Sequence, residues 1–162
     1  MSKFVKISLI KIAIVFLVIA LDLISKQVFY MKNATIIPYL IGIREVYSLN
    51  TGGAWGILGD STWLLVAITI VAILSFCAFD IFAKKTNVVY SLSISFLVGG
   101  AIGNLIDRIA LGGVRDFIYF PFMPSFPTFN VADSFIFVGA VLLLVYVIFL
   151  YKPEAKQDKK AK

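Results

Sequence analysis

Apolar residues dominate four long stretches of the chain, and each stretch is long enough to cross a lipid bilayer as a helix. A hydrocarbon core about 30 Å thick needs about 20 apolar helical residues. The stretches run over residues 7–24, 63–82, 88–106 and 134–151. Because lipid offers no hydrogen-bond partners to backbone groups, each stretch is predicted to be a helix. The pattern predicts an all-α polytopic membrane protein with four transmembrane helices.

Two segments between these stretches have a different character. Residues 31–62 contain a predicted short strand at 43–49, followed by a glycine-rich run at 50–56. Residues 108–133 carry three prolines, which prevent a helix, and six aromatic residues, which suit the membrane interface. We expect a small extracytoplasmic β-like cradle from the first segment and an interfacial segment from the second. Both should pack at the outer membrane surface.

Composition agrees with a membrane protein. Of the 162 residues, 60% are hydrophobic and 15% are charged, and the mean hydropathy is +0.97. Soluble domains have about 45–50% apolar and about 25% charged residues. Such a chain has too little polar surface to cover its core in water. We expect one membrane-embedded domain over residues 1–152 and a polar cytoplasmic tail over residues 153–162.

The basic residues fall into two unequal groups that predict the orientation. Ten lie near the two chain termini and the loop at 83–87, and five lie near the opposite ends of the helices. Since cytoplasmic segments carry an excess of Lys and Arg, both termini are predicted to be cytoplasmic. The net charge of +6 is thereby attributed to membrane topology, and no nucleic-acid partner is expected.

The chain has no histidine and a single cysteine, Cys77. These counts exclude Ser-His-Asp and Cys-His catalysis, His-based zinc sites and an intrachain disulfide. Carboxylates, lysines, hydroxyls or backbone groups must carry any chemistry. No metal and no other cofactor is expected.

Two aspartates are the candidates for hydrolytic chemistry. In an extended segment, Asp116 shares a face with Val114 and Ile118, and the resulting desolvation favours the neutral acid. Asp133 lies where the last predicted helix begins, so a role as N-cap or first-turn acid explains it equally well. In one low-dielectric pocket, the two carboxyls would share a proton and activate a water molecule.

Two further acids have a lysine four residues later, a spacing that favours ion pairs on a helix. For Asp22 and Lys26, a structural pair and a role in orienting site residues both remain open. For Asp80 and Lys84, near a helix end, a surface pair is predicted.

Five short motifs follow one another along the chain. They are Asp22-x-x-x-Lys26, Asn50-x-Gly52-x-Ala54-Trp55, Gly99-Gly100-x-x-Gly103-Asn104-x-x-Asp107-Arg108, Val114-x-Asp116-Phe117 and Phe129-Asn130-x-Ala132-Asp133. In this order on a chain of four spans, they resemble bacterial lipoprotein signal peptidase (signal peptidase II), a family of membrane aspartic peptidases. The resemblance covers roughly residues 7–150, with Trp55 as a variant of an aromatic position.

The resemblance implies an activity and a location. The implied reaction removes the signal peptide from diacylglyceryl-modified prolipoproteins, with cleavage just before the lipidated cysteine. The implied location is the bacterial cytoplasmic membrane, with the active site near the outer leaflet and the peptidase domain spanning residues 1–152. The implied partners are prolipoproteins and membrane lipids. The oligomeric state stays open, with a monomer as the expectation.

The resemblance also implies residue roles. Asp116 and Asp133 match the catalytic pair. Other matched positions bind substrate or support the site: Asn50, Gly103, Asn104, Arg108, Asn130, Asp22 and Lys26. Gly103 leaves room for a neighbouring helix or for substrate. Arg108 has three candidate partners, namely Asp107, Asp22 and a substrate carbonyl, although adjacent helical residues do not face each other.

Two other functions fit parts of the pattern. A non-enzymatic transport or assembly subunit would use the charges at the helix ends for a polar pathway or for helix pairing. A lipid-headgroup transferase would need metal-binding acids clustered along helices. The spacing of Asp116 and Asp133 does not favour the second alternative.

Overall fold

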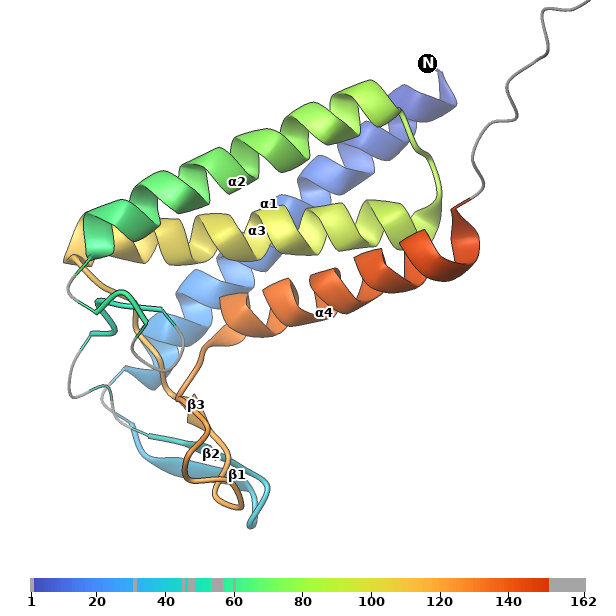
Figure 1. Ribbon diagram of the computed structural model, residues 1–162. Coiled ribbons are helices and arrows are strands. Elements are labelled where there is room, and N and C mark those ends of the chain that lie inside the picture. The colour runs from blue at the N-terminus through green and yellow to red at the C-terminus, as the bar shows by residue number, and fades with distance from the viewer. Residues whose placement is uncertain are drawn as a thin grey trace, which may run out of the picture.

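The computed structural model describes residues 2–30, 32–44, 46, 49–53, 57–59 and 61–151. Its helices are α1 (Lys3–Phe29), α2 (Thr62–Ala83), α3 (Val88–Leu111) and α4 (Val131–Val145), the last continued by the π-helix η2 (Tyr146–Leu150). The helices form one bundle (Figure 1), and α4 with η2 makes a single apolar span. All four predicted spans are confirmed, with ends within five residues of those expected.

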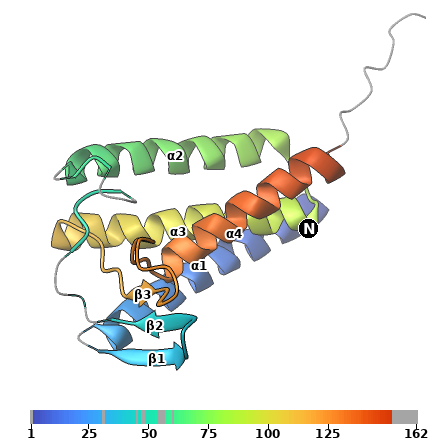
Figure 2. The same cartoon turned by 60° about the horizontal axis from the view of Figure 1, so that its bottom comes forward.

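Helix α3 is the centre of the bundle, with the other three helices around it (Figure 2). It buries 61% of its most apolar window, whereas the other three spans bury 17% or less. Glycines permit this close packing. A Cβ at Gly99 would lie 2.8 Å from the Val18 side chain of α1, and one at Gly100 would lie 2.5 Å from the Ala132 carbonyl oxygen of α4. The small residues of α3 therefore set its distance from both neighbours.

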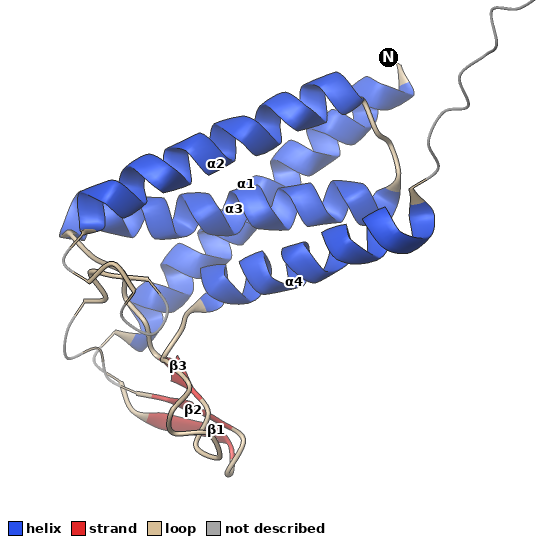
Figure 3. Ribbon diagram, viewed as in Figure 1, coloured by secondary structure: helices blue, strands red, loops and turns tan. Residues whose placement is uncertain are grey.

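A small antiparallel sheet lies at one end of the bundle (Figure 3). Its strands are β1 (Ala34–Ile37), β2 (Ile41–Ile43) and β3 (Ile118–Tyr119), in that spatial order. The sheet confirms the β-like cradle predicted for the first outer segment, and the second outer segment adds β3 to it. Gly42 of β2 lies opposite Tyr119 of β3, and a Cβ at this position would collide with the tyrosine ring.

The predicted strand at 43–49 is wrong. The hairpin forms earlier in the segment, and residues 44, 46 and 49 lie outside any strand. The prediction followed local β propensity, whereas β2 forms where a glycine allows close pairing with β3, which is distant in sequence. Residues 45, 47 and 48, the motif positions Ala54 and Trp55, and the tail from 152 to 162 lie outside the described residues.

The two ends of the bundle differ in content. The sheet and its loops occupy one end, while the start of α1, the α2–α3 connection and the end of η2 occupy the other (Figure 1). At this second end, Lys11 Nζ lies 2.6 Å from Asp80 Oδ1 and ties α1 to α2. The predicted pair of Asp80 with Lys84 is therefore wrong. Lys84 instead ends α2 in a left-handed conformation, with φ of 48°.

A small apolar cluster joins the sheet to the bundle. Ile43, Val46 and Phe117 are buried in it. The ring centroids of Phe117 and Phe29, the last residue of α1, lie 5.4 Å apart. Since Phe117 directly follows Asp116, this packing fixes the segment that carries the candidate catalytic acid.

Candidate active site

Asp116 lies on the extended segment between α3 and β3. Two backbone hydrogen bonds of 2.9 Å pair Val114 with Asn50, so that the Asn50 side chain reaches the aspartate. Asn50 Nδ2 donates to Asp116 Oδ2 at 2.9 Å, and Asn130 Nδ2 donates to Asp116 Oδ1 at 2.7 Å. Both carboxyl oxygens are therefore held by amides from other parts of the chain.

Asp133 lies in the first turn of α4 and does two things there. It forms a capping box with Asn130, in which each side chain accepts a hydrogen bond from the other's backbone N–H. It also accepts a hydrogen bond of 2.7 Å from Asn104 Nδ2 of α3. The sequence did not decide whether Asp133 caps the helix or belongs to the site. In the structure Asp133 caps α4 and also belongs to the polar network.

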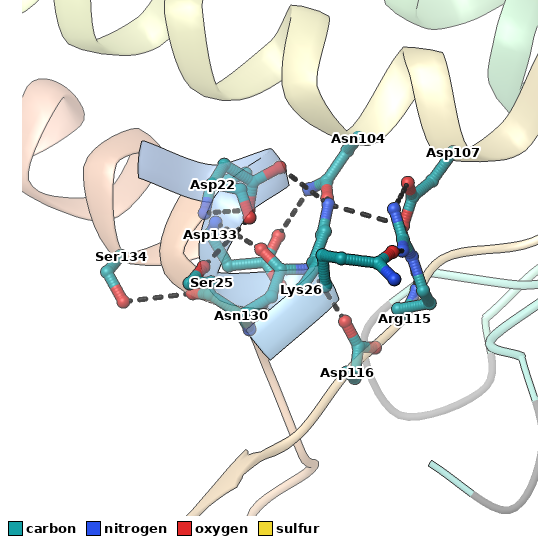
Figure 4. A network of polar contacts seen from close by, with 12 residues as sticks. Asp22, Ser25, Lys26, Asn104, Asp107, Arg115, Asp116, Asn130, Asp133 and Ser134 are labelled. Carbon is teal, nitrogen blue, oxygen red and sulfur yellow. Dashed lines mark hydrogen bonds and ion pairs between the residues drawn. The ribbon is translucent and has the colours of Figure 1, made fainter. Parts of the chain in front are cut away.

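Asn130 is the residue that links the two acids (Figure 4). Its side chain donates to Asp116, and its backbone N–H donates to Asp133 Oδ2 at 3.2 Å. Its Nδ2 also lies 3.0 Å from Asn104 Oδ1. Asn130 and Asn104 are buried, while Asp116 and Asp133 keep part of their surface exposed. The two carboxyls are thus fixed from behind and remain accessible from one side.

The surroundings of Asp116 favour its neutral form. Burial raises the pKa of Asp116 to about 7, and the negative charge of Asp133 acts in the same direction. The hydrogen bonds from Asn50 and Asn130 oppose the shift without cancelling it. A carboxyl that holds a proton near neutral pH beside a second carboxyl is what water activation by an aspartate pair requires.

Behind the two acids, Asp22 and Lys26 form a fully buried ion pair between Oδ2 and Nζ at 2.7 Å. Lys26 Nζ also donates to Asn104 Oδ1 at 3.0 Å. Asp22 Oδ1 accepts from the backbone N–H of Ala132 at 2.9 Å, which satisfies a free donor at the start of α4. The pair therefore fills both roles that the sequence left open, because it joins three helices and orients Asn104.

Sequence reasoning missed two salt bridges at this site, both made by Asp107. Arg115 and Asp107 make a two-point contact, with Nη2–Oδ1 at 2.7 Å and Nε–Oδ2 at 3.2 Å. Asp107 also lies 3.4 Å from Lys26 Nζ. The sequence offered Asp107 only as a candidate partner of Arg108, and Arg115 entered only the count of basic residues. Their separation of eight residues, across a helix end, gives no local signal of pairing.

Arg108 contacts neither acid that the sequence offered as a partner. Its Nη2 donates instead to the carbonyl oxygen of Gly52 at 3.2 Å, which joins α3 to the glycine-rich segment. Its buried Nε has no hydrogen-bond partner among the described residues. One buried N–H of the guanidinium therefore lacks a hydrogen bond within the described part of the chain, near the charges of the two aspartates.

Gly103 of α3 lies against the buried ion pair. A Cβ here would lie 2.6 Å from Asp22 Oδ2 and 3.4 Å from the Ala132 Cβ. At this position the glycine makes room for α1 and its aspartate, so the structure supports the helix-packing interpretation.

We expect Gly103→Ala to lower activity at least about tenfold, because the methyl group must displace Asp22. Overpacking typically costs about 1–3 kcal/mol. The matched control is Gly99→Ala, whose methyl group meets the apolar Val18 side chain. Thermal unfolding should show similar losses for both variants, while cleavage assays should show the larger loss for Gly103→Ala. Equal activities would contradict this prediction.

Comparison with known proteins identifies the family. A family model described as signal peptidase (SPase) II matches residues 14–149. The chain belongs to the signal peptidase II family. It is accordingly a membrane aspartic peptidase of the signal peptidase II type, a multi-pass bacterial membrane protein that acts in the removal of lipoprotein signal peptides.

Individual relatives agree with this assignment. A lipoprotein signal peptidase of Clostridium tetani (strain Massachusetts / E88) is 38% identical over 157 residues, which cover 93% of this chain and 97% of the relative. Two solved structures of a bacterial membrane enzyme, obtained by the in meso method at 2.3 Å and 1.9 Å resolution, are each 31% identical. They superpose with TM-scores of 0.75 and 0.76 over 90% and 87% of this chain, and each match covers 94% of the solved chain.

Proposed function

We propose that this signal peptidase II cleaves diacylglyceryl-modified prolipoproteins just before the lipidated cysteine, with Asp116 and Asp133 as its catalytic pair. One observation carries the proposal. Asn130, at the start of α4, donates hydrogen bonds to both carboxyls, and the charge of Asp133 acts on Asp116. Among the described residues, no cluster of three or more His, Cys, Asp or Glu side chains is arranged to hold a metal ion.

The mechanism follows from the shared proton. The ionised aspartate accepts a proton from a water molecule as the water oxygen attacks the scissile carbonyl carbon. The protonated aspartate donates a hydrogen bond to the carbonyl oxygen, on which negative charge develops. As the C–N bond breaks, the amine of the departing cysteine takes up a proton from the pair. Because the two carboxyls titrate as a unit, the resting proton belongs to the pair.

The remaining site residues position the pair or the substrate. Asn50 and Asn130 hold Asp116, and Asn104 holds Asp133, so each carboxyl keeps a defined orientation before substrate binds. The partly exposed guanidinium of Arg108, which lies near both aspartates, would hold a substrate carbonyl.

We further propose that the sheet end of the bundle faces the outer leaflet and that both termini are cytoplasmic. The grouping of basic residues supports this orientation, since Lys3, Lys6, Lys84 and Lys85 belong to the end opposite the sheet. The peptidase domain would cover residues 1–152, with a cytoplasmic tail at 153–162. The substrate's signal helix would enter laterally from the lipid while its acyl chains remain in the bilayer.

The test is cleavage of a diacylglyceryl-modified prolipoprotein by the full chain in detergent, in the presence of a chelator. Mass spectrometry of the products should locate the cut just before the lipidated cysteine, and the unlipidated precursor should not be cut. Cleavage at another bond, or equal cleavage of the unlipidated precursor, would contradict the proposal. No cleavage of fully lipidated substrate would contradict the proposal as well.

The activity should depend on pH as the shared proton requires. The rate should fall as the pH rises through about 7, because the raised pKa of Asp116 marks the loss of that proton. It should also fall at low pH, where both carboxyls are protonated and no base remains. Values of kcat/KM from about pH 5 to about pH 9 test this, with thermal unfolding at each pH as the control. A rate that stays constant while the pH rises through 7 and well beyond it would contradict the prediction.

A further inference from the structure

Arg115 contacts Asp107 more extensively than an ordinary surface arginine contacts an acid. Three N–H donors of this one residue meet the same carboxylate: Nη2 at 2.7 Å, Nε at 3.2 Å and its own backbone N–H at 3.1 Å. The Arg115 side chain is 14% exposed and that of Asp107 is 1% exposed. A two-point guanidinium–carboxylate contact fixes geometry as well as charge. The segment after α3 is therefore clamped to α3 at the residue before Asp116.

The clamp continues to the second aspartate. Asp107 Oδ2 lies 3.4 Å from Lys26 Nζ, which donates to Asn104 Oδ1 at 3.0 Å. Asn104 Nδ2 in turn donates to Asp133 Oδ1 at 2.7 Å. Arg115 is thus joined to one acid by a peptide bond and to the other by a continuous chain of polar contacts (Figure 4).

Arg115 lies among the charged groups around the site. The titratable and charged groups that face one another here come from α1, α3, α4 and the segment that follows α3. They are Asp22, Lys26, Tyr30, Asp107, Arg108, Arg115, Asp116 and Asp133. Among these described groups, four carboxylates meet three cations. One proton shared by Asp116 and Asp133 makes the site neutral. The bonds from Asp107 raise the pKa of Arg115, so its charge is permanent.

We propose that Arg115 is a positioning residue of the peptidase, given the proposed catalytic pair: its two-point contact with Asp107 holds Asp116 in place. It touches neither substrate nor water in this role. Nothing in the spacing of the sequence motifs indicates this function.

Arg115→Gln separates this role from a merely structural one. Loss of the clamp should lower kcat by about 10- to 100-fold, with KM within about threefold of wild type, since a small misplacement of a reacting group has effects of this size.

Arg115→Lys keeps the charge and loses the two-point contact. It should recover part of the rate lost in Arg115→Gln, with kcat about three- to tenfold below wild type. The matched control is Lys84→Gln, which removes one exposed cation at the opposite end of the bundle and should leave kcat and KM unchanged.

The assay is kcat and KM for the full chain in detergent with diacylglyceryl-modified prolipoprotein. Wild-type kcat in Arg115→Gln would overturn the proposal, as would a KM that rises as far as kcat falls, or a kcat in Arg115→Lys no higher than in Arg115→Gln. If Arg115→Gln does not fold, Arg115→Lys is a sufficient test. Wild-type kcat in Arg115→Lys would contradict the proposed role of the two-point contact. Asp116→Asn and Asp133→Asn run alongside: activity in these variants would instead refute the catalytic pair.

Discussion

Asp116→Asn and Asp133→Asn should each lower kcat at least about a thousandfold, because an amide can neither accept the proton of water nor carry the shared proton. The fold should survive both changes. Each carboxyl accepts hydrogen bonds at both of its oxygens, and the amide oxygen of Asn keeps one of them. One lost hydrogen bond costs about 1 kcal/mol. A large loss of rate with a small loss of stability is therefore the expected signature.

The measurement is single-turnover cleavage of lipidated prolipoprotein, together with thermal unfolding of each variant in the same detergent. Asp80→Asn is the matched control, since it also converts a paired carboxylate into an amide, at the opposite end of the bundle. That variant should lose some stability and keep its activity. If either Asp116→Asn or Asp133→Asn retained more than about a tenth of the wild-type rate, the assignment of the pair would be wrong.

The sequence predicted those features that depend on local composition. The spans were predicted because each is a long apolar run, and the site residues because their motifs recur together on a four-span chain. Asp133 shows what a local pattern can predict. Its position at the start of α4 correctly indicated a helix cap. That pattern could not show that the same carboxyl also meets Asn104 of α3.

The predictions that failed depended on contacts between distant segments. The spacing of Asp80 and Lys84 favoured a pair on one helix, yet the carboxylate bonds Lys11 from another helix at 2.6 Å. An i,i+4 pair near a helix end contributes only a few tenths of a kcal/mol, so a nearby buried lysine readily takes the partner. The bond between Arg115 and Asp107 also joins two different segments, so no spacing in the sequence indicated it.

Fold and site share the same side chains at the start of α4. Asn130 caps the helix and also binds Asp116, while Asp22 satisfies the Ala132 N–H and also holds Lys26. Replacing such residues changes stability and activity together. Variants of the ion pair therefore measure how much of the fold depends on this network.

Lys26→Met should destabilise the protein more than other single changes of a paired cation in the chain's described part. Lys26 Nζ is fully buried and meets oxygens of Asp22, Asn104 and Asp107. Its loss leaves the buried Asp22 carboxylate without a cation, and breaking a buried pair in this way costs about 3–5 kcal/mol. Cleavage should fall to background because Asn104 loses one of the contacts that orient it toward Asp133. Thermal unfolding and cleavage in the same detergent measure both effects.

Two comparisons separate the unpaired charge from lost packing. In Asp22→Asn/Lys26→Met the charge is gone, and the amide oxygen introduced by the first substitution can still accept from the Ala132 N–H, so the double variant should be more stable than Lys26→Met alone. Lys11→Met should cost less than Lys26→Met, since its partner Asp80 has a side chain that is 17% exposed and can reach water. If Lys26→Met unfolded at the wild-type temperature, the buried pair would not hold the helices together. If the double variant were the less stable one, the cost would lie in packing and hydrogen bonds, because no unpaired charge remains in it.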